Sequence, residues 1–160
     1  MTLLAHSIRK RLLLLCIVII TPFLFTSCIS LRALFGGEIL VKVNVEEKAN
    51  VNSATRFDIL LVYDETLLAT VSELTAKDWF EKKYQISRDY PSDSGFDVWN
   101  WEWSPGQEIK GLSLPLRSKA LACIIFADYN TPGTHRMKIS PHYNIIVDLN
   151  EREFNAVSEE

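Results

Sequence analysis

Short runs of alternating apolar and polar residues recur along most of this chain, and they constrain its fold more than any other feature. The first run extends from Ile39 to Val45, where every second residue is Ile or Val and the residues between them include Lys42 and Asn44. A period of two places the apolar side chains on one face of a β-strand. Further strand-like runs occur at 56–64, 96–103, 107–116, 121–129, 136–140 and 143–149.

Only one segment carries a clear helical signal. Thr75 is followed three residues later by Asp78, which is the spacing of a capping box, and we therefore predict one short helix at Ala76–Tyr84. The segment Thr66–Ser72 fits either a third short strand or the approach to that helix. Seven to eight short strands with one short helix predict an all-β fold, and a β-sandwich rather than a parallel α/β sheet.

The first 27 residues predict a signal peptide rather than a part of the fold. Arg9, Lys10 and Arg11 precede the uncharged run 12–25. This run is shorter than the ~20 apolar residues that span a bilayer. A basic cluster followed by an apolar run of this length is typical of a secretory signal.

The end of this signal, Phe25-Thr26-Ser27-Cys28, resembles the lipobox of bacterial lipoproteins. In that class the signal peptide is removed before the cysteine, which carries a diacylglyceryl thioether and an acylated amine. The resemblance implies cleavage between Ser27 and Cys28 and a lipid on Cys28. The alternatives are an ordinary secretory signal before an unmodified Cys28, or an uncleaved anchor. Ile29 rather than Asp follows the cysteine, which resembles lipoproteins of the outer membrane that face the periplasm.

Cleavage would divide the chain into a signal peptide (1–27), a lipidated tether (28–37), a β-sandwich domain (38–150) and an acidic tail (151–160) that we expect to be frayed. It would remove 27 of 160 residues and three of 17 basic residues, so 133 residues remain with 14 Lys and Arg against 20 Asp and Glu, a charge of −6. A domain of this size buries its own core. The acidic balance argues against a nucleic-acid partner.

The search for catalytic and metal-binding motifs finds none that we can assign, and we predict no enzyme, metal site or small-molecule substrate. The apolar run 121–126 predicts a buried Cys123 rather than a reactive thiol. His135 and His142 could meet in a hairpin, or His135 could pair with Cys123, but no third metal ligand is indicated. Two carboxylate pairs lie in turn-like segments, where capping is their default role: Asp64/Glu65 and Asp89/Asp93.

Three tryptophans at period two, Trp99, Trp101 and Trp103, form the most unusual local pattern. If they were exposed, they would form a stacking platform for sugars, and this gives the alternative function of a glycan- or peptidoglycan-binding lipoprotein. If they were buried, they would form one side of the core. The polar residues Asn100 and Glu102 on the opposite face favour burial.

The order of the motifs resembles that of a known family, the outer-membrane lipoproteins of type VI secretion systems (TssJ, VasD or SciN). The resemblance covers about Val41 to Ile139. It rests on the lipobox, the first strand and the following elements: Ala49-Asn50, Leu61–Tyr63, Ala76–Phe80, Pro105–Glu108, Leu112 with Leu114, Ala127–Tyr129 and His135-Arg136. The loop at 48–55 lacks the Pro and Gly that are usual in the family, and His135 stands where a Trp is usual.

This resemblance implies a transthyretin-like β-sandwich and a tethering function. The chain would bind the periplasmic C-terminal domain of an IcmF-like inner-membrane protein and so attach the secretion complex to outer-membrane lipid, with the lipid on Cys28 as its only non-protein group. In the family the loop between the first two strands carries the contact. This loop corresponds here to Lys48, Asn50, Val51, Asn52 and Ser53. Alternatively, Asn50, Asn52 and Ser53 only satisfy hydrogen bonds of the turn.

Overall fold

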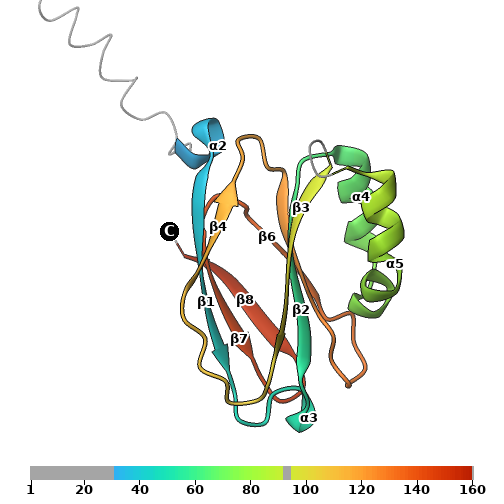
Figure 1. Cartoon of the computed structure of the whole chain (residues 1–160), viewed down its shortest axis with the longest axis vertical. Helices are drawn as coiled ribbons and strands as arrows, with labels where there is room; N and C mark the ends of the chain where they lie inside the picture. Colours follow the sequence, from blue (N-terminus) through green and yellow to red (C-terminus); the bar gives the residue numbers. More distant parts are fainter. Residues whose placement is uncertain (1–30, 92–94, 160) are drawn as a thin grey trace, which may run out of the picture.

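The computed structural model describes residues 31–91 and 95–159, so the predicted signal peptide, Ser27 and Cys28 lie outside the described residues. Within these ranges eight strands form two four-stranded sheets, with the orders β4-β1-β7-β8 and β3-β2-β5-β6 (Figure 1). The β-sandwich prediction is therefore confirmed. The strands are β1 (Gly37–Val45), β2 (Thr55–Val62), β3 (Phe96–Trp103), β4 (Leu112–Leu116), β5 (Ala122–Ala127), β6 (Arg136–Ile139), β7 (Asn144–Leu149) and β8 (Phe154–Glu159).

The strand directions divide the loops between two ends of the sandwich. β1 is parallel to β7, and every other pair of neighbouring strands is antiparallel. The start of β1 and the loops 117–121 and 140–143 therefore lie at one end, which we call the N-terminal end. The loops 46–54, 104–111, 128–135 and 150–153 lie at the other, which we call the distal end (Figure 1).

The space between the sheets is filled by the alternating residues that the sequence indicates. Ile39, Val41 and Val43 of β1 are buried, whereas Lys42 and Asn44 are exposed. In contrast, β5 is buried at every position, because its sheet is covered on both faces. The apolar run around Cys123 reflects that double burial.

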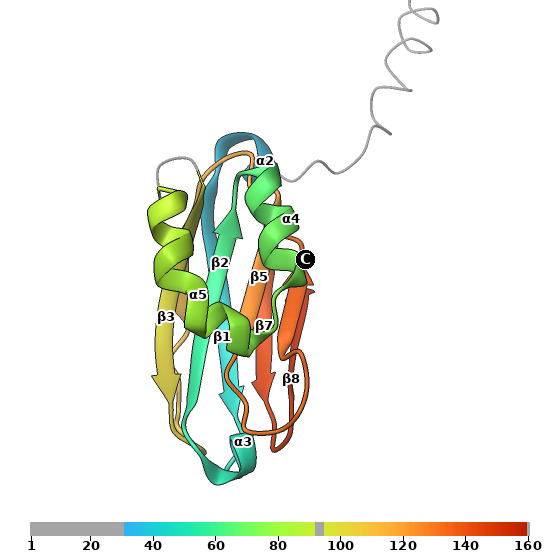
Figure 2. The same ribbon diagram turned by 90° about the vertical axis from the view of Figure 1, so that its right-hand side faces the viewer.

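Two helices cover the outer face of the second sheet (Figure 2). α4 (Glu65–Glu73) begins at Asp64, whose carboxylate accepts a hydrogen bond from the Leu67 N–H at 2.7 Å. α5 (Ala76–Asp89) begins with the predicted Thr75–Asp78 capping box and continues beyond the predicted end. The expectation of one helix was therefore too low, and the ambiguous segment 66–72 is helical.

A buried carboxylate attaches α5 to the sheet beneath it. The Asp58 carboxylate on β2 accepts hydrogen bonds from Trp79 Nε1 at 2.8 Å and from Lys83 Nζ at 2.9 Å. The Trp79 ring is fully buried and stacks on Phe126, with 5.2 Å between the ring centroids. Both donors come from α5, so the pair fixes the helix on its sheet.

Both ends of the domain differ from the sequence prediction. Residues 151–160 were expected to fray, but Phe154–Glu159 form β8, which pairs with β7 and buries Phe154 and Ala156. β8 pairs with an edge of β7 that would otherwise be open. The backbone hydrogen bonds gained there stabilise the strand despite its acidic residues. The segment Leu31–Phe35, within the predicted tether, forms the short helix α2.

Candidate functional site

The predicted contact loop forms a single turn, α3 (Ala49–Asn52), at the distal end (Figure 1). Three successive residues have left-handed backbone angles, with φ of 50° at Asn50, 53° at Val51 and 60° at Asn52. Asparagine tolerates this region, whereas a β-branched residue such as Val51 is strained there by about 1–2 kcal/mol. Such conformations persist only where the surroundings hold them, and they gather at functional sites.

The Asn50 side chain holds the turn in place. It is 1% exposed. Its amide nitrogen donates to the carbonyl oxygens of Ala54 at 3.0 Å and Asp128 at 3.1 Å, and its Oδ1 accepts from the Asn130 N–H at 2.6 Å. Two of these three hydrogen bonds join α3 to the neighbouring loop 128–135, and the third closes the turn on its own loop.

The backbone of the turn is also bonded to the last distal loop. The N–H groups of Asn50 and Val51 donate to the carbonyls of Asn150 at 3.1 Å and Glu151 at 2.8 Å. The Asn150 carbonyl accepts as well from the Tyr129 hydroxyl at 3.0 Å. Burial raises the pKa of Tyr129, so the hydroxyl stays a donor throughout the physiological range. Three distal loops therefore form one hydrogen-bonded unit.

The five predicted contact residues separate into two groups. Asn50 faces inward and serves the turn, as the alternative interpretation held. Val51 is 50% exposed, Lys48 and Asn52 are exposed, and Ser53 is half-buried. An apolar tip is thus presented outward on a strained but fixed backbone. The exposed carboxylates around it belong to Glu46, Glu47, Glu151 and Glu153.

The tryptophan pattern of β3 lies mainly against the core. Trp103 is buried and stacks on Trp101, with 5.5 Å between centroids and 19° between ring planes. Trp99 and Trp101 are half-buried and pack against the core between the sheets. Rings stacked on one another do not offer a flat row of faces to a sugar, and the burial interpretation is the one that the structure supports.

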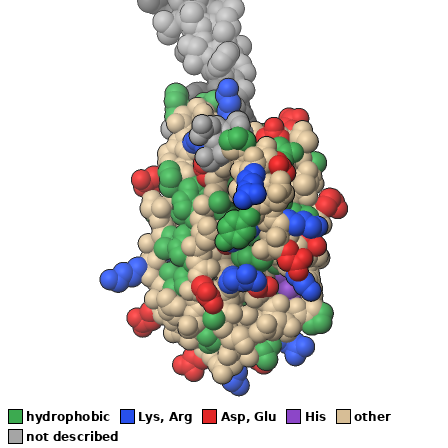
Figure 3. Space-filling view, turned by 45° about the vertical axis from the view of Figure 1, so that its right-hand side comes forward, with side chains coloured by type: hydrophobic (Ala, Val, Ile, Leu, Met, Phe, Trp, Pro, Cys, Tyr) green, Lys and Arg blue, Asp and Glu red, His purple; other side chains and the backbone are tan. Residues whose placement is uncertain are grey.

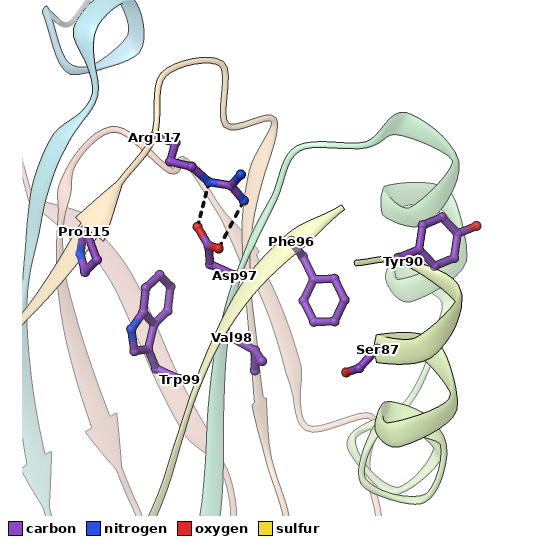
Figure 4. A pocket seen from close by; sticks show the side chains of 8 residues that line it. All are labelled: Ser87, Tyr90, Phe96, Asp97, Val98, Trp99, Pro115 and Arg117. Carbon is purple, nitrogen blue, oxygen red and sulfur yellow. Dashed lines mark hydrogen bonds and ion pairs between the residues drawn. The ribbon is translucent and has the colours of Figure 1, made fainter. Parts of the chain in front are cut away.

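A groove of about 660 Å³ lies over the N-terminal part of β3, which is an outer strand of its sheet (Figure 4). Arg117 and Asp97, which both line it, form a two-pronged ion pair with N–O distances of 3.0 and 3.1 Å. The Arg117 guanidinium also lies 3.9 Å from the centroid of the Tyr63 ring. Sequence reasoning did not single out these residues, because the pair joins Asp97 on β3 to Arg117 in the loop after β4, twenty residues away. The other lining residues are Ser87, Tyr90, Phe96, Val98, Trp99 and Pro115.

The histidines and Cys123 do not come together. Cys123 is fully buried, and desolvation raises the pKa of its thiol to about 12. His135 lies at the distal end, where its ring stacks on Tyr129 at 5.0 Å and its carbonyl accepts from Ala127. Cys123 lies four residues before Ala127 on β5, which places it about 13 Å from the point where Ala127 contacts His135.

His142 lies at the opposite end of β6 from His135, so the hairpin meeting that the spacing allowed does not occur. Burial lowers the pKa of His142. Across residues 31–91 and 95–159, no group of three His, Cys, Asp or Glu side chains is placed to hold a metal ion. Nor is any helix in these ranges both long and apolar enough to cross a membrane.

The carboxylate pairs serve local structure where they are described. Asp64 caps α4, and Glu65 lies exposed in the first turn of that helix. Asp89 accepts a hydrogen bond from Gln85 Nε2 at 2.9 Å. Asp93 lies outside the described residues.

Comparison with known proteins gives matches in structure only. No protein-family model and no curated protein matches the sequence. The T6SS lipoprotein TssJ1 of Pseudomonas aeruginosa superposes with a TM-score of 0.59 at 12% identity, over 78% of this chain and 98% of that one. The chain has the fold of a type VI secretion lipoprotein.

Two further solved structures carry the same fold. Serratia marcescens Lip, a membrane-bound component of the type VI secretion system, matches with a TM-score of 0.57 at 14% identity, over 78% of this chain and 99% of that one. A chain in the structure of the T6SS protein TssM C-terminal domain from EAEC matches with a TM-score of 0.53 at 11% identity, over 78% and 98%. The likeness spans nearly the whole of each solved chain.

Proposed function

We propose that this chain is a TssJ-type lipoprotein that binds the periplasmic domain of an IcmF-like, TssM-type inner-membrane protein. Anchored by a lipid on Cys28 at the periplasmic face of the outer membrane, it tethers the type VI secretion membrane complex there. The observation that carries the proposal is the structural likeness, which extends over 98–99% of two solved secretion lipoproteins. The Phe25–Cys28 lipobox supports the anchor independently of that likeness.

The two ends of the sandwich suit a tether. α2 begins three residues after Cys28, whereas α3 lies at the far end of β1 (Figure 1). A nine-residue strand is about 27 Å long. The anchor therefore leaves α3 directed away from the membrane, toward a protein that approaches from the periplasm.

The contact surface extends beyond α3. A stable interface buries roughly 800 Å² on each partner, which is more than one turn supplies. The hydrogen-bonded distal loops 128–135 and 150–153 adjoin α3 and are the proposed remainder. Val51 is the proposed apolar anchor, and Lys48, Asn52 and Ser53 contribute its polar surroundings. The role is one of binding, without catalysis and without a cofactor beyond the lipid.

A pulldown from solubilised envelopes tests this function. Tagged wild type and Cys28→Ala are expressed in a strain that has a type VI secretion system, and proteins that copurify are identified by mass. We expect both to recover a large IcmF-like protein, because the anchor and the contact lie at opposite ends. Only the wild type should fractionate with the outer membrane.

Recovery of peptidoglycan alone would instead favour the glycan-binding alternative. Recovery of no IcmF-like protein by the wild type, in a strain that makes one, would contradict the proposed function.

A further inference from the structure

We propose that α2 is a membrane-contact helix whose exposed apolar side chains rest in the headgroup layer and hold the sandwich upright on the bilayer. The inference rests on the proposed lipidation of Cys28 and goes beyond it, because a lipid alone would leave the domain free to swing. In this proposal the bilayer is contacted by the surface of α2 as well as by the acyl chains.

The first support is the exposure of two large apolar residues in α2. Phe35 is 82% exposed and Leu34 is 59% exposed, and Phe35 is the most exposed large apolar side chain in the described part of the chain. Leu121, in the adjoining loop of the N-terminal end, is exposed as well. Single exposed apolar residues are ordinary on protein surfaces, so exposure alone does not indicate a lipid contact. The position of these residues relative to the sandwich and to Cys28 does.

That position is fixed relative to the sandwich. Arg32 Nη1 donates to Asn144 Oδ1 at 2.9 Å, and the Lys119 N–H donates to the Ala33 carbonyl at 3.4 Å. Gly36 follows the helix with a φ of 74°, and a Cβ there would lie 2.4 Å from the Leu116 carbonyl oxygen. The helix is thus joined to β7 and to the loop 117–121, and its exposed side chains point in a set direction.

The length of chain between the lipid and α2 confines the helix to the membrane surface. Only Ile29 and Ser30 separate Cys28 from Leu31. Three residue steps span at most about 11 Å. The polar layer on each side of a bilayer core is itself about 5–8 Å thick. An acylated Cys28 therefore cannot hold its lipid in the membrane while α2 stands far from the headgroups.

The charges near α2 are compatible with this contact. Lys119 is exposed and Arg32 half-buried beside the apolar pair, and an apolar surface bordered by cations is typical of interfacial segments. The carboxylates at this end include Glu38, bonded to Ser113, Asp64 as a helix cap, and Glu65. Asp97 is paired with Arg117. The apolar contact therefore contributes more than net charge does.

Cysteine accessibility in the membrane-bound chain tests the inference. The lipidated mature chain (28–160) carrying Phe35→Cys is added to preformed phosphatidylethanolamine–phosphatidylglycerol vesicles and treated with a charged maleimide that does not cross membranes. Tyr84→Cys on α5, where the native residue is 76% exposed, is the matched control. Cys123 is buried with a raised thiol pKa and contributes little background. Leu34→Cys repeats the test with Phe35 intact.

We expect vesicles to slow labelling at positions 35 and 34 at least tenfold, relative to the same variants expressed without residues 1–28 and therefore without the lipid. Labelling at position 84 should change less than twofold. Equal accessibility of positions 35 and 84 on vesicles, with acylation of Cys28 confirmed by mass, would overturn the inference and leave the proposed function standing. An unacylated Cys28 would overturn both.

Discussion

The two ends of this sandwich are built in different ways. At the N-terminal end, α2 is joined to β7 and to the loop 117–121 and exposes the large apolar side chains of Leu34 and Phe35. At the distal end, α3 buries Asn50 and exposes only Val51 among its apolar residues, on a backbone held by two neighbouring loops. A fluid lipid surface needs an apolar area without precise geometry, whereas a protein partner needs a fixed shape. The difference agrees with the proposed assignment of α2 to lipid and of α3 to a protein partner.

The largest expected effect comes from removing the side-chain hydrogen bonds that hold α3 at the distal end. Asn50→Ala removes three side-chain hydrogen bonds and places an alanine in the left-handed region, so the free energy of unfolding should fall by about 3 kcal/mol. Partner binding should fall with it. Denaturant unfolding measures the first effect. Asn155→Ala, on the exposed side of β8, is the control and should change stability by less than about 0.5 kcal/mol.

A variant remote from the distal-end contact distinguishes lost geometry from lost stability. Asp58→Ala leaves Trp79 Nε1 and Lys83 Nζ without their buried acceptor, and we expect a loss of about 3 kcal/mol, since Lys83 is partly able to reach solvent. At a temperature where the variant remains folded, partner affinity should equal that of the wild type. Equal loss of affinity in Asp58→Ala and Asn50→Ala would show that partner binding depends on overall stability and not on the geometry of the distal loops.

Placing a charge at the tip tests the contact without disturbing the fold. Val51→Asp puts a carboxylate where the proposed apolar anchor lies, among existing carboxylates, and should weaken partner binding at least tenfold, or about 1.4 kcal/mol. Aspartate tolerates the left-handed region, so folding is preserved. Val157→Asp, at a residue 45% exposed on β8, is the matched control. Isothermal titration with the purified partner domain measures both affinities, and the affinity of Val157→Asp should equal that of the wild type.

The smallest effect concerns the strain itself. Val51→Asn replaces a β-branched residue with one suited to a φ of 53°, and the relief of strain should exceed the lost apolar burial. We expect the free energy of unfolding to rise by about 0.5 kcal/mol, measured by chemical denaturation beside Val157→Asn. A decrease at position 51 would mean that the left-handed turn is not under strain.

Sequence reasoning succeeded where the signal was local. The alternation of Ile39, Val41 and Val43 predicts β1, and the spacing of Thr75 and Asp78 predicts the start of α5. Each depends on neighbours within one strand or one helical turn, so no knowledge of the rest of the fold is needed.

Features set by distant residues were missed. β8 is stabilised by its pairing with β7, and its own segment, with a small Ala156 and several acids, carries a weak strand signal. α4 contains β-branched residues that also suit a strand. Asn50 was predicted as a contact residue, but it is inward-facing because its partners, Asp128 and Asn130, lie about eighty residues away. The sequence predicts a contact on the loop 48–55, which stays a prediction, and it could not separate the buried Asn50 from the exposed residues of that loop.

The most direct test of the central claim places a photo-crosslinking phenylalanine analogue at position 51 or position 35 in living cells that carry a type VI secretion system. We predict that position 51 forms an adduct with an IcmF-like inner-membrane protein, identified by mass, and that position 35 forms no adduct with that protein. An adduct with that protein from position 35, or none from position 51 while the wild type copurifies with it, would contradict the assignment of the two ends.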